Sequence, residues 1–231
     1  MMMQACTHRW AVNEISYTKI AAGRDIQSNV FYDSLIAPYR HHLEAQMNEV
    51  IGFSLVEMPK QKDQTETLLG NFVADLVFKT VTETLGLKAD ACLLNIGGLR
   101  SSLPQGNITR GNIFSLAPFE NEVVLVEVHP NTVKKLFLYL AQKPQPIAGF
   151  SVNMKPDGTI LELKGGLAQT KESYIIITSD YLANGGDNMD FFKESLGIVA
   201  TGIKLRDMII DYIKMKKEIQ SILDQRIQIT P

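Results

Sequence analysis

The chain has 231 residues, of which 45% are hydrophobic and 21% are charged, and its formal net charge at pH 7 is -2. This length supplies enough apolar material for a packed core, and the near-neutral charge leaves no basic surface for nucleic acid. Two cysteines are too few for a disulfide framework, the four histidines lack the spacing of a metal cluster, and no apolar run is long enough to span a membrane. We therefore expect a globular protein that does not bind nucleic acid.

The first six residues, Met-Met-Met-Gln-Ala-Cys, resemble the end of a bacterial lipoprotein signal, in which a small residue precedes the cysteine that receives lipid. The charged part and most of the apolar part of such a signal are missing. Two interpretations stay open. In the first, Cys6 carries a lipid anchor, which would be the protein's only link to a membrane, and the protein is periplasmic or on the cell surface. In the second, residues 1–13 are an ordinary tail. In the second case, with a native N-terminus, the protein would be cytoplasmic.

Hydrophobic spacing predicts the elements of the first half of the chain. In chain order we expect a strand over 14–21, a helix over 33–49, a strand over 50–56, a helix over 65–86 and a buried strand over 89–95. Gly86 follows the last apolar residue of the second helix, where glycine commonly ends helices.

The second half alternates strands and helices in the same way. After a short segment at 108–116 we expect a strand over 122–128, a helix over 131–142, a hairpin of 147–154 with 159–163, a strand over 174–178, a helical run over 188–195 and a long helix over 204–227.

A glycine-rich turn, Asn95-Ile96-Gly97-Gly98-Leu99-Arg100, follows the buried strand at 89–95. Glycine pairs at a strand end can bring backbone N–H groups to an anion, and an arginine adds a bidentate clamp for phosphate or carboxylate. The spacing is neither a Walker nor a dinucleotide motif, so this turn alone is a weak indication of an anion site.

A second turn follows the strand at 174–178 and carries Tyr181 and Asp187 on either side of Asn184-Gly185-Gly186. A ring that stacks and a carboxylate that accepts hydrogen bonds from neighbouring hydroxyls would suit a nucleoside or a sugar. The alternative is a tight turn in which Tyr181 is a core residue and Asp187 caps the run at 188–195. Phe119, between Pro118 and the strand at 122–128, has a similar alternative, packing at the edge of the core.

Three segments taken together resemble the C-terminal, substrate-binding domain of the 5'-nucleotidase and UDP-sugar hydrolase family. They are Asn95-Ile-Gly-Gly-Leu-Arg100, Pro118-Phe-Glu-Asn121 and Asp180-Tyr-Leu-Ala-Asn-Gly-Gly-Asp187, in the order and at the spacing of the family. The resemblance covers residues 14–231 and implies one α+β domain, a mixed α/β structure with α/β/β/α layers. It also implies a role in nucleotide catabolism as the nucleotide-binding part of a hydrolase.

The resemblance assigns roles to the motif residues. Phe119 and Tyr181 would sandwich the base, and Asp187 would hold the ribose hydroxyls. The other groups that would contact the substrate are Asn95, Arg100 and Asn121, and the loop glycines are Gly97, Gly98, Gly185 and Gly186.

Two departures from the family limit what the resemblance implies. The segment 59–69 lacks the usual arginines, and only Lys60 and Lys62 could replace them. These 231 residues also lack the family's metallophosphoesterase domain, so we expect no catalytic residue and no metal site in them. The two divalent metals would belong to a catalytic partner, either a separate chain or an upstream domain. The alternative is a nucleoside- or nucleotide-sugar-binding protein that works without hydrolysis.

Overall fold

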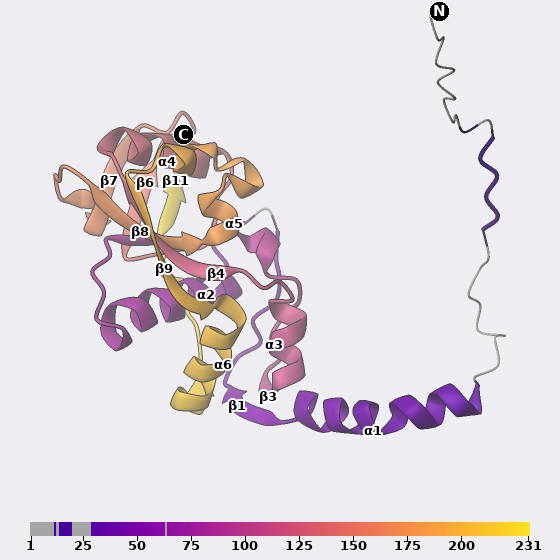
Figure 1. Cartoon of the computed structure of the whole chain (residues 1–231). Coiled ribbons are helices and arrows are strands. Elements are labelled where there is room, and N and C mark those ends of the chain that lie inside the picture. Colours follow the sequence, from indigo (N-terminus) through magenta and orange to yellow (C-terminus); the bar gives the residue numbers. More distant parts are fainter. Residues whose placement is uncertain (1–11, 13, 20–28, 63) are drawn as a thin grey trace, which may run out of the picture. The chain divides into compact units, whose positions relative to one another are not determined.

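The computed structural model describes residues 12, 14–19, 29–62 and 64–231 (Figure 1). The chain separates into two units, Met1–His42 and Leu43–Pro231. Most of the tail at 1–13, including Cys6, lies outside the described residues. In the part of the chain that is described, no helix has the length and apolar character that crossing a membrane requires.

The first unit contains the start of helix α1 (Val30–Met47). This helix begins after Asn29, whose Oδ1 accepts a hydrogen bond of 3.0 Å from the Phe31 N–H. The predicted start of this helix at residue 33 is therefore three residues late, and the Asp33 carboxylate, inside the helix, lies 3.7 Å from the Arg40 guanidinium. The predicted strand at 14–21 is wrong where the structure describes it, because residues 14–19 form no strand.

The second unit is built on a five-stranded sheet with the order β5-β2-β8-β4-β9. Its strands are β5 (Ile147–Ala148), β2 (Ala91–Leu93), β8 (Tyr174–Ser179), β4 (Glu122–Val128) and β9 (Gly197–Lys204). Only β2 and β8 run parallel, and every other neighbouring pair is antiparallel.

Two three-stranded sheets complete the unit. In sheet order they are β10 (Glu218–Ile219), β1 (Val50–Ser54) and β3 (Gly106–Thr109), and β11 (Ile227–Ile229), β6 (Phe150–Met154) and β7 (Ile160–Gly165). Strands β6 and β7 are antiparallel, so the predicted hairpin is confirmed from Phe150 onward. Residues 147–148, which the prediction placed in the hairpin, form β5 and pair with β2 of the central sheet instead.

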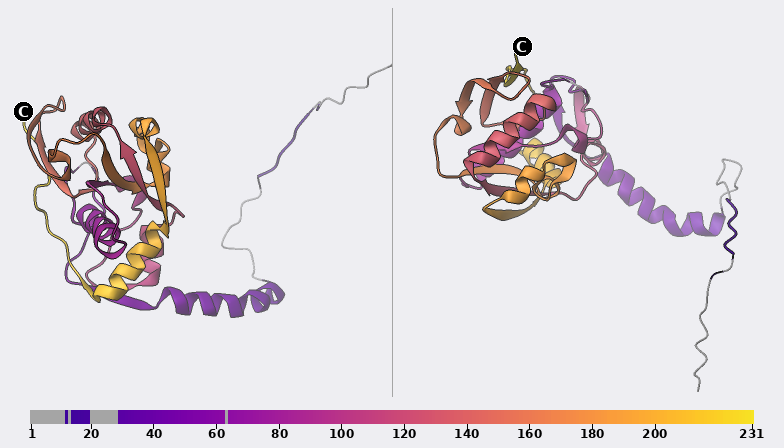
Figure 2. Two further views of the ribbon diagram at one scale, coloured as in Figure 1. Left: turned by 60° about the vertical axis from the view of Figure 1, so that its left-hand side comes forward. Right: turned by 90° about the horizontal axis from the view of Figure 1, so that it is seen from above.

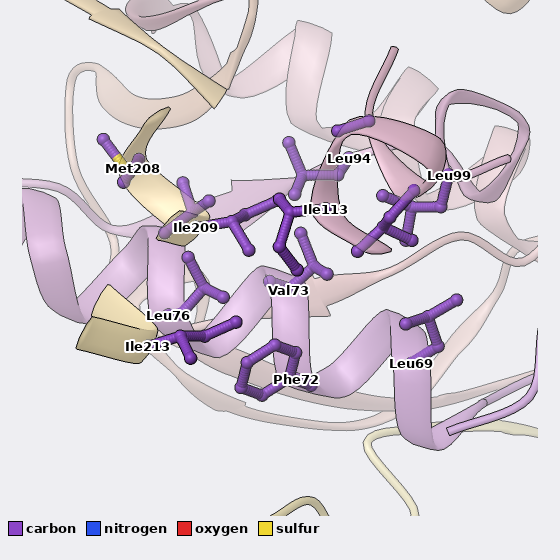
Figure 3. Close-up of a cluster of buried hydrophobic side chains, with 14 of the residues drawn as sticks. Leu69, Phe72, Val73, Leu76, Leu94, Leu99, Ile113, Met208, Ile209 and Ile213 are labelled. Carbon is purple, nitrogen blue, oxygen red and sulfur yellow. The ribbon is translucent and has the colours of Figure 1, made fainter. Parts of the chain in front are cut away.

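Helices cover both faces of the central sheet because its strands alternate between two apolar cores. Val123 and Leu125 of β4 join a core with α2 (Leu68–Lys79), α3 (Arg110–Leu116) and α6 (Leu205–Lys216). Figure 3 shows part of this core, with side chains of α2 and α6 gathered around Leu94, Leu99 and Ile113.

The other face of the sheet packs against a different helix. Val124 and Val126, the alternate residues of β4, join a second core with α4 (Pro130–Gln142). The further views in Figure 2 show α4 on the side of the sheet away from α2 and α6. Helices on both faces of mixed sheets agree with the predicted α+β class.

The long helix predicted over 204–227 is wrong. Helix α6 ends at Lys216, Lys217 adopts a left-handed conformation with φ of 64°, and the chain then enters β10. Ile219, which continues the helical spacing in the sequence, is buried beside β1 instead. Pairing with an open edge of β1 and burial of Ile219 outweigh the local preference for helix, which is a weak force.

Two segments of the chain form elements that the sequence did not predict. Strand β9 has side chains exposed on both faces for most of its length, so its sequence lacks the alternation that identifies a half-buried strand. The segment at 108–116 divides into β3 and α3, and a capping box between Thr109 and Asn112 starts the helix.

Candidate functional site

The three motif segments meet at one edge of the central sheet, and the strand directions explain why. Strands β2 and β8 are parallel, so the turn after β2 and the turn after β8 leave the sheet on the same side. Strand β4 is antiparallel to β8, with Val123 opposite Ser179, so the segment that precedes β4 reaches the same edge. Residues that are far apart in the sequence thereby become neighbours.

The carboxylate of Asp187 joins two of these segments. Asn95 Nδ2 donates a hydrogen bond of 2.7 Å to Asp187 Oδ2, across 92 positions of the chain. The Tyr181 hydroxyl lies 3.3 Å from Asp187 Oδ1 and accepts from the Asp187 N–H at 3.2 Å. Asp187 itself is in the left-handed region, with φ of 54°. The alternative in which Asp187 caps the following helical run is therefore wrong, since Met189 precedes the short 3₁₀ turn Asp190–Glu194.

The loop glycines make these contacts sterically possible. A Cβ on Gly186 would lie 2.4 Å from Cε1 of Tyr181, so the ring rests directly on this glycine. Gly185 has φ of 88°, a conformation that side chains other than glycine rarely adopt. In the other turn, a Cβ on Gly98 would lie 2.8 Å from Asn95 Oδ1, and one on Gly97 would lie 3.3 Å from Asp187 Oδ2.

Both predicted aromatic residues are outside the core. Phe119 is 47% exposed and Tyr181 is 46% exposed. The alternative in which Tyr181 is a core residue is therefore wrong, whereas packing of Phe119 at the edge of the core is not tested by this value. Asn121 lines an open cavity of about 440 Å³ together with Tyr181, and it lines a small hollow together with Phe119 and Asn95. Asn121 therefore shares one hollow with each ring.

Arg100 lies beside Phe119 at the end of the first turn. Its guanidinium carbon is 5.9 Å from the centre of the Phe119 ring, within the range of a cation–π contact. Its Nη1 is 3.5 Å from the Gly97 carbonyl oxygen. The side chain of Arg100 is exposed, so its remaining donors face solvent.

Lys60 and Lys62 are brought close to Arg100 by backbone contacts. Met58 pairs with Leu103, and the Lys60 N–H donates a hydrogen bond of 2.8 Å to Ser102 Oγ. Burial lowers the pKa of Lys60 below its usual range, and the positive charges of Arg100 and Lys62 lower it further. Lys60 thus lies close enough to both Arg100 and Lys62 for their charges to act on it.

Helix α4 and the turn after it brace the site, and sequence reasoning missed their part. The Tyr139 hydroxyl donates a hydrogen bond of 3.0 Å to the Asp187 carbonyl oxygen, and its ring packs edge-on against Phe191. Burial, with smaller effects of Asp187 and Tyr181, raises the pKa of Tyr139 to about 12. Gln145 Oε1 accepts from the Ile96 N–H at 3.0 Å. In the sequence Tyr139 lies on the apolar stripe of a helix, so no signal separated it from core residues.

The Phe119 segment is held by charge. Glu120 forms ion pairs with Lys204 and with Arg206, whose guanidinium also lies 4.3 Å from the centre of the Phe114 ring. Hydrogen bonds from Lys204 and then Arg206 lower the pKa of Glu120 to about 2. Both cations come from the junction of β9 and α6, and this part of the chain carries no predicted site residue.

Acidic, histidine and cysteine side chains are dispersed through the described residues. No three of them there are grouped so that they could hold a metal ion. What the three motifs form together is a polar and aromatic edge with hydrogen-bonding groups on Asn95, Asn121 and Asp187. Such an arrangement can bind an aromatic ligand with hydroxyl groups.

Comparison with known proteins gives a consistent result. The sequence model of the family described as "5'-nucleotidase, C-terminal domain" matches residues 50–194. The chain is 28% identical to the Trifunctional nucleotide phosphoesterase protein YfkN of Bacillus subtilis over 68% of its own length and 12% of that protein. It is 26% identical to Protein UshA of Escherichia coli over 82% of its length and 35% of that protein. The chain thus spans only a minor part of these relatives.

Solved structures share the fold. The 5'-nucleotidase precursor of Thermus thermophilus superimposes with a TM-score of 0.71 and 24% identity, over 87% of this chain and 44% of that one. The NAD nucleotidase NadN of Haemophilus influenzae gives a TM-score of 0.66 at 17% identity, over 88% of this chain and 42% of that one.

Proposed function

Because the chain belongs to the family of 5'-nucleotidase C-terminal domains, we propose that it binds the nucleoside part of a nucleotide and presents it to a metallophosphoesterase. The observation that carries the proposal is the Asp187 carboxylate, which joins Asn95 and Tyr181 beside two exposed rings. The rings of Phe119 and Tyr181 hold the base between them. Asp187 accepts hydrogen bonds from the ribose hydroxyls, and Asn95 and Asn121 contact the remaining polar groups.

Arg100 is proposed to hold the anionic end of the ligand with Lys60 and Lys62. The pKa of Lys60 is lowered partly by the positive charges of Arg100 and Lys62, and a phosphate placed among the three would remove that repulsion. Two lysines supply point charges where arginines would supply a planar fork, so we expect the phosphate to be held less rigidly.

The hydrolytic step is proposed to take place in a catalytic domain, either upstream in the same polypeptide or in a separate chain. Phosphomonoester cleavage is among the slowest uncatalysed reactions, and two divalent metals can activate the attacking water and stabilise the charge that develops. The role of the residues described here is to position the substrate, because binding a ground state does not by itself accelerate cleavage.

Calorimetric titration of adenosine tests the binding proposal. Asp187→Ala should weaken binding by about tenfold or more, since a hydrogen bond to a charged group contributes roughly 1.5–3 kcal/mol. Tyr181→Ala should lose the stacking contribution of roughly 0.5–1.5 kcal/mol, whereas Tyr181→Phe should lose little. Tyr32→Ala, a change of an exposed tyrosine on α1, is the matched control.

Two results would contradict the assignment. Equal affinity of the wild type and Tyr181→Ala for adenosine would remove Tyr181 from the site. Equal affinity of the wild type for adenosine and 2'-deoxyadenosine would remove Asp187 from contact with the ribose.

The division of labour needs a separate assay. Phosphate release from AMP and UDP-sugars is measured with added manganese, cobalt or zinc, with and without a candidate metallophosphoesterase. We expect turnover only with the partner. Metal-dependent turnover by the 231 residues alone, abolished by Arg100→Ala, would show that they form a complete enzyme.

We also propose that the protein acts outside the cytoplasm, anchored through Cys6. The support is the small residue before a cysteine near the start of the sequence. Incorporation of labelled palmitate in a bacterial host, lost in Cys6→Ser, is the expected result. Absence of label in both proteins would refute the anchor.

A further inference from the structure

A cavity of about 530 Å³ lies next to the candidate nucleoside site. Gly97 and Asp187 form part of its wall, whereas neither Phe119 nor Tyr181 does. The cavity therefore shares the Asp187 side of the nucleoside site and extends away from the two rings. Its volume lies in the range of about 300–1,000 Å³ that is usual for small-molecule sites.

Gln145 presents a free donor in the wall of this cavity. The residue is only 4% exposed. Its Oε1 accepts from the Ile96 N–H, which leaves Nε2 as a donor with no partner among the described residues. Among the described residues, the only fully enclosed side-chain polar atoms that lack a hydrogen-bond partner are Ser101 Oγ and Arg206 Nε. Gln145 Nε2 lacks a partner and is not one of them, so it must be accessible from open space. Because Gln145 lines the cavity, that space is the cavity.

Asn71 presents a complementary acceptor in the same wall. The residue is 2% exposed, and its Nδ2 donates to Glu66 Oε1 at 2.5 Å and to the Ile222 carbonyl oxygen at 2.8 Å. Both donor hydrogens are thereby used, and Oδ1 has no partner among the described residues. By the same reasoning as for Gln145, this oxygen faces the cavity that Asn71 lines. A buried polar atom of this kind costs free energy unless a ligand or water satisfies it.

The charges around the cavity are distributed unequally. Arg226 lies in the wall, but its three nitrogens are engaged by Asp75, Asp224 and the Ile147 carbonyl oxygen. Two carboxylates line the cavity as well, and both accept hydrogen bonds: Glu66 from Asn71 and from the N–H groups of Asp224 and Gln225, and Asp187 from Asn95 and the Tyr181 hydroxyl. Lys62 and Lys143 also line the cavity, are exposed, and form no ion pair within the described residues. A ligand that fits has an uncharged hydrogen-bonding part inside and a negative charge near the two lysines.

We propose that this cavity receives a second nucleoside, joined by a phosphodiester to the 3'-oxygen of the ribose whose 2'-hydroxyl Asp187 holds, so that the site takes dinucleotides as well as mononucleosides. The inference rests on the proposed function, because it places a ribose at Asp187. A nucleobase edge offers both an acceptor for Gln145 Nε2 and a donor for Asn71 Oδ1. The single charge of the phosphodiester lies near Lys62 and Lys143, and the second nucleoside fills the interior, where the charged groups of Arg226 and Glu66 are already engaged by other residues.

The test compares three probes with the full chain: adenosine, 3'-AMP and adenylyl-(3'→5')-adenosine. We expect the dinucleotide to bind about tenfold more tightly than either other probe, a difference that calorimetry resolves easily. In NMR spectra the side-chain amide signal of Gln145, identified by its loss in Gln145→Glu, should shift with the dinucleotide and stay in place with adenosine. Lys143→Ala should weaken the dinucleotide alone, and Lys134→Ala, an exposed lysine that does not line the cavity, is the control.

Failure of this inference is distinguishable from failure of the proposed function. If adenosine binds in an Asp187-dependent way, but the dinucleotide binds no more tightly than 3'-AMP and leaves the Gln145 signal unmoved, the cavity is not a nucleoside subsite. If adenosine does not bind at all, both the proposed function and this inference are refuted. If Gln145→Glu does not fold, the Gln145 side-chain amide signal is assigned by triple-resonance spectra of the wild-type chain, so the NMR measurement remains decisive.

Discussion

Phe119 and Tyr181 are equally open to solvent, since 47% of the first residue and 46% of the second are exposed. Different forces nevertheless hold the two loops that carry them. The Phe119 loop is fixed through Glu120, which pairs with Lys204 and Arg206. The Tyr181 loop is fixed by contact with Gly186 and by hydrogen bonds that are not ion pairs. Asn95 and the Tyr181 hydroxyl donate to the Asp187 carboxylate, and the Tyr139 hydroxyl donates to the Asp187 carbonyl oxygen.

This difference has a physical consequence for the site. Ion pairs between exposed groups weaken with added salt and with protonation of the carboxylate. Steric contact and the hydrogen bond from the Tyr139 hydroxyl respond much less to added salt or to a fall in pH. We therefore expect the Phe119 side of the site to be adjustable by the solution and the Tyr181 side to keep one geometry.

The largest effect should come from adding a methyl group under the Tyr181 ring. Gly186→Ala places a Cβ about 2.4 Å from Tyr181 Cε1, and overpacking of this kind costs roughly 1–3 kcal/mol. Thermal unfolding should show the loss of stability, and adenosine titration should show weaker binding, because the ring is displaced.

A double-mutant cycle isolates the cause. In a Tyr181→Ala background, Gly186→Ala should cost much less stability, since the clashing atoms are gone. An equal cost in both backgrounds would mean that the glycine is needed for backbone reasons and that the ring does not depend on it.

A smaller effect should follow from Tyr139→Phe. The change keeps the packing against Phe191 and removes only the hydrogen bond to the Asp187 carbonyl oxygen, which contributes roughly 0.5–1.5 kcal/mol. We expect weaker adenosine binding with little change in the enthalpy of thermal unfolding. Leu138→Ala, at an exposed neighbouring position on α4, is the control, and identical binding by all three proteins would show that Tyr139 does not position Asp187.

The smallest effect should come from titrating Glu120. Its pKa is lowered to about 2 from 4.5 by hydrogen bonds from Lys204 and Arg206. A lowered carboxyl pKa means that the stabilising contribution is complete above pH 4.5 and is lost as the pH falls through about 2. NMR signals of the Phe119 ring should follow this transition in the wild type and should lack it in Glu120→Gln.

Salt sharpens the same comparison. Added sodium chloride at neutral pH should move the Phe119 signals and leave those of Tyr181 almost unchanged. Equal responses of the two rings would contradict the idea that different forces hold the two loops.

The sequence predicted β4, α4 and the hairpin of β6 with β7 because these elements have strong local patterns. The strand at 122–128, the helix near 131–142 and the hairpin around Gly158 all appear in the structure. Each combines regular apolar spacing with turn residues, and neither signal depends on the rest of the chain. The long helix over 204–227 failed because the residues after Lys216 form strands with partners that only the folded chain supplies.

In the candidate site, too, some features follow from the local sequence and others from the tertiary structure. The sequence by itself determined which residue types stand at the ends of the strands: the glycines, the two rings, Asn95, Arg100 and Asp187. The glycine turns at these positions can be predicted from the local sequence, because they depend only on φ and on the absence of a Cβ. Even the family resemblance rests on such short segments.

Only the tertiary structure decided which of these groups touch and what supports them. The bond from Asn95 to Asp187, the brace from Tyr139, and the pairing of Glu120 with Arg206 each join segments at least 48 positions apart. Such contacts depend on strand order and direction in the sheet, and no local pattern encodes them. The cavity lined by Gln145 Nε2 and Asn71 Oδ1 also exists only in the folded chain, since its walls come from both ends of the second unit.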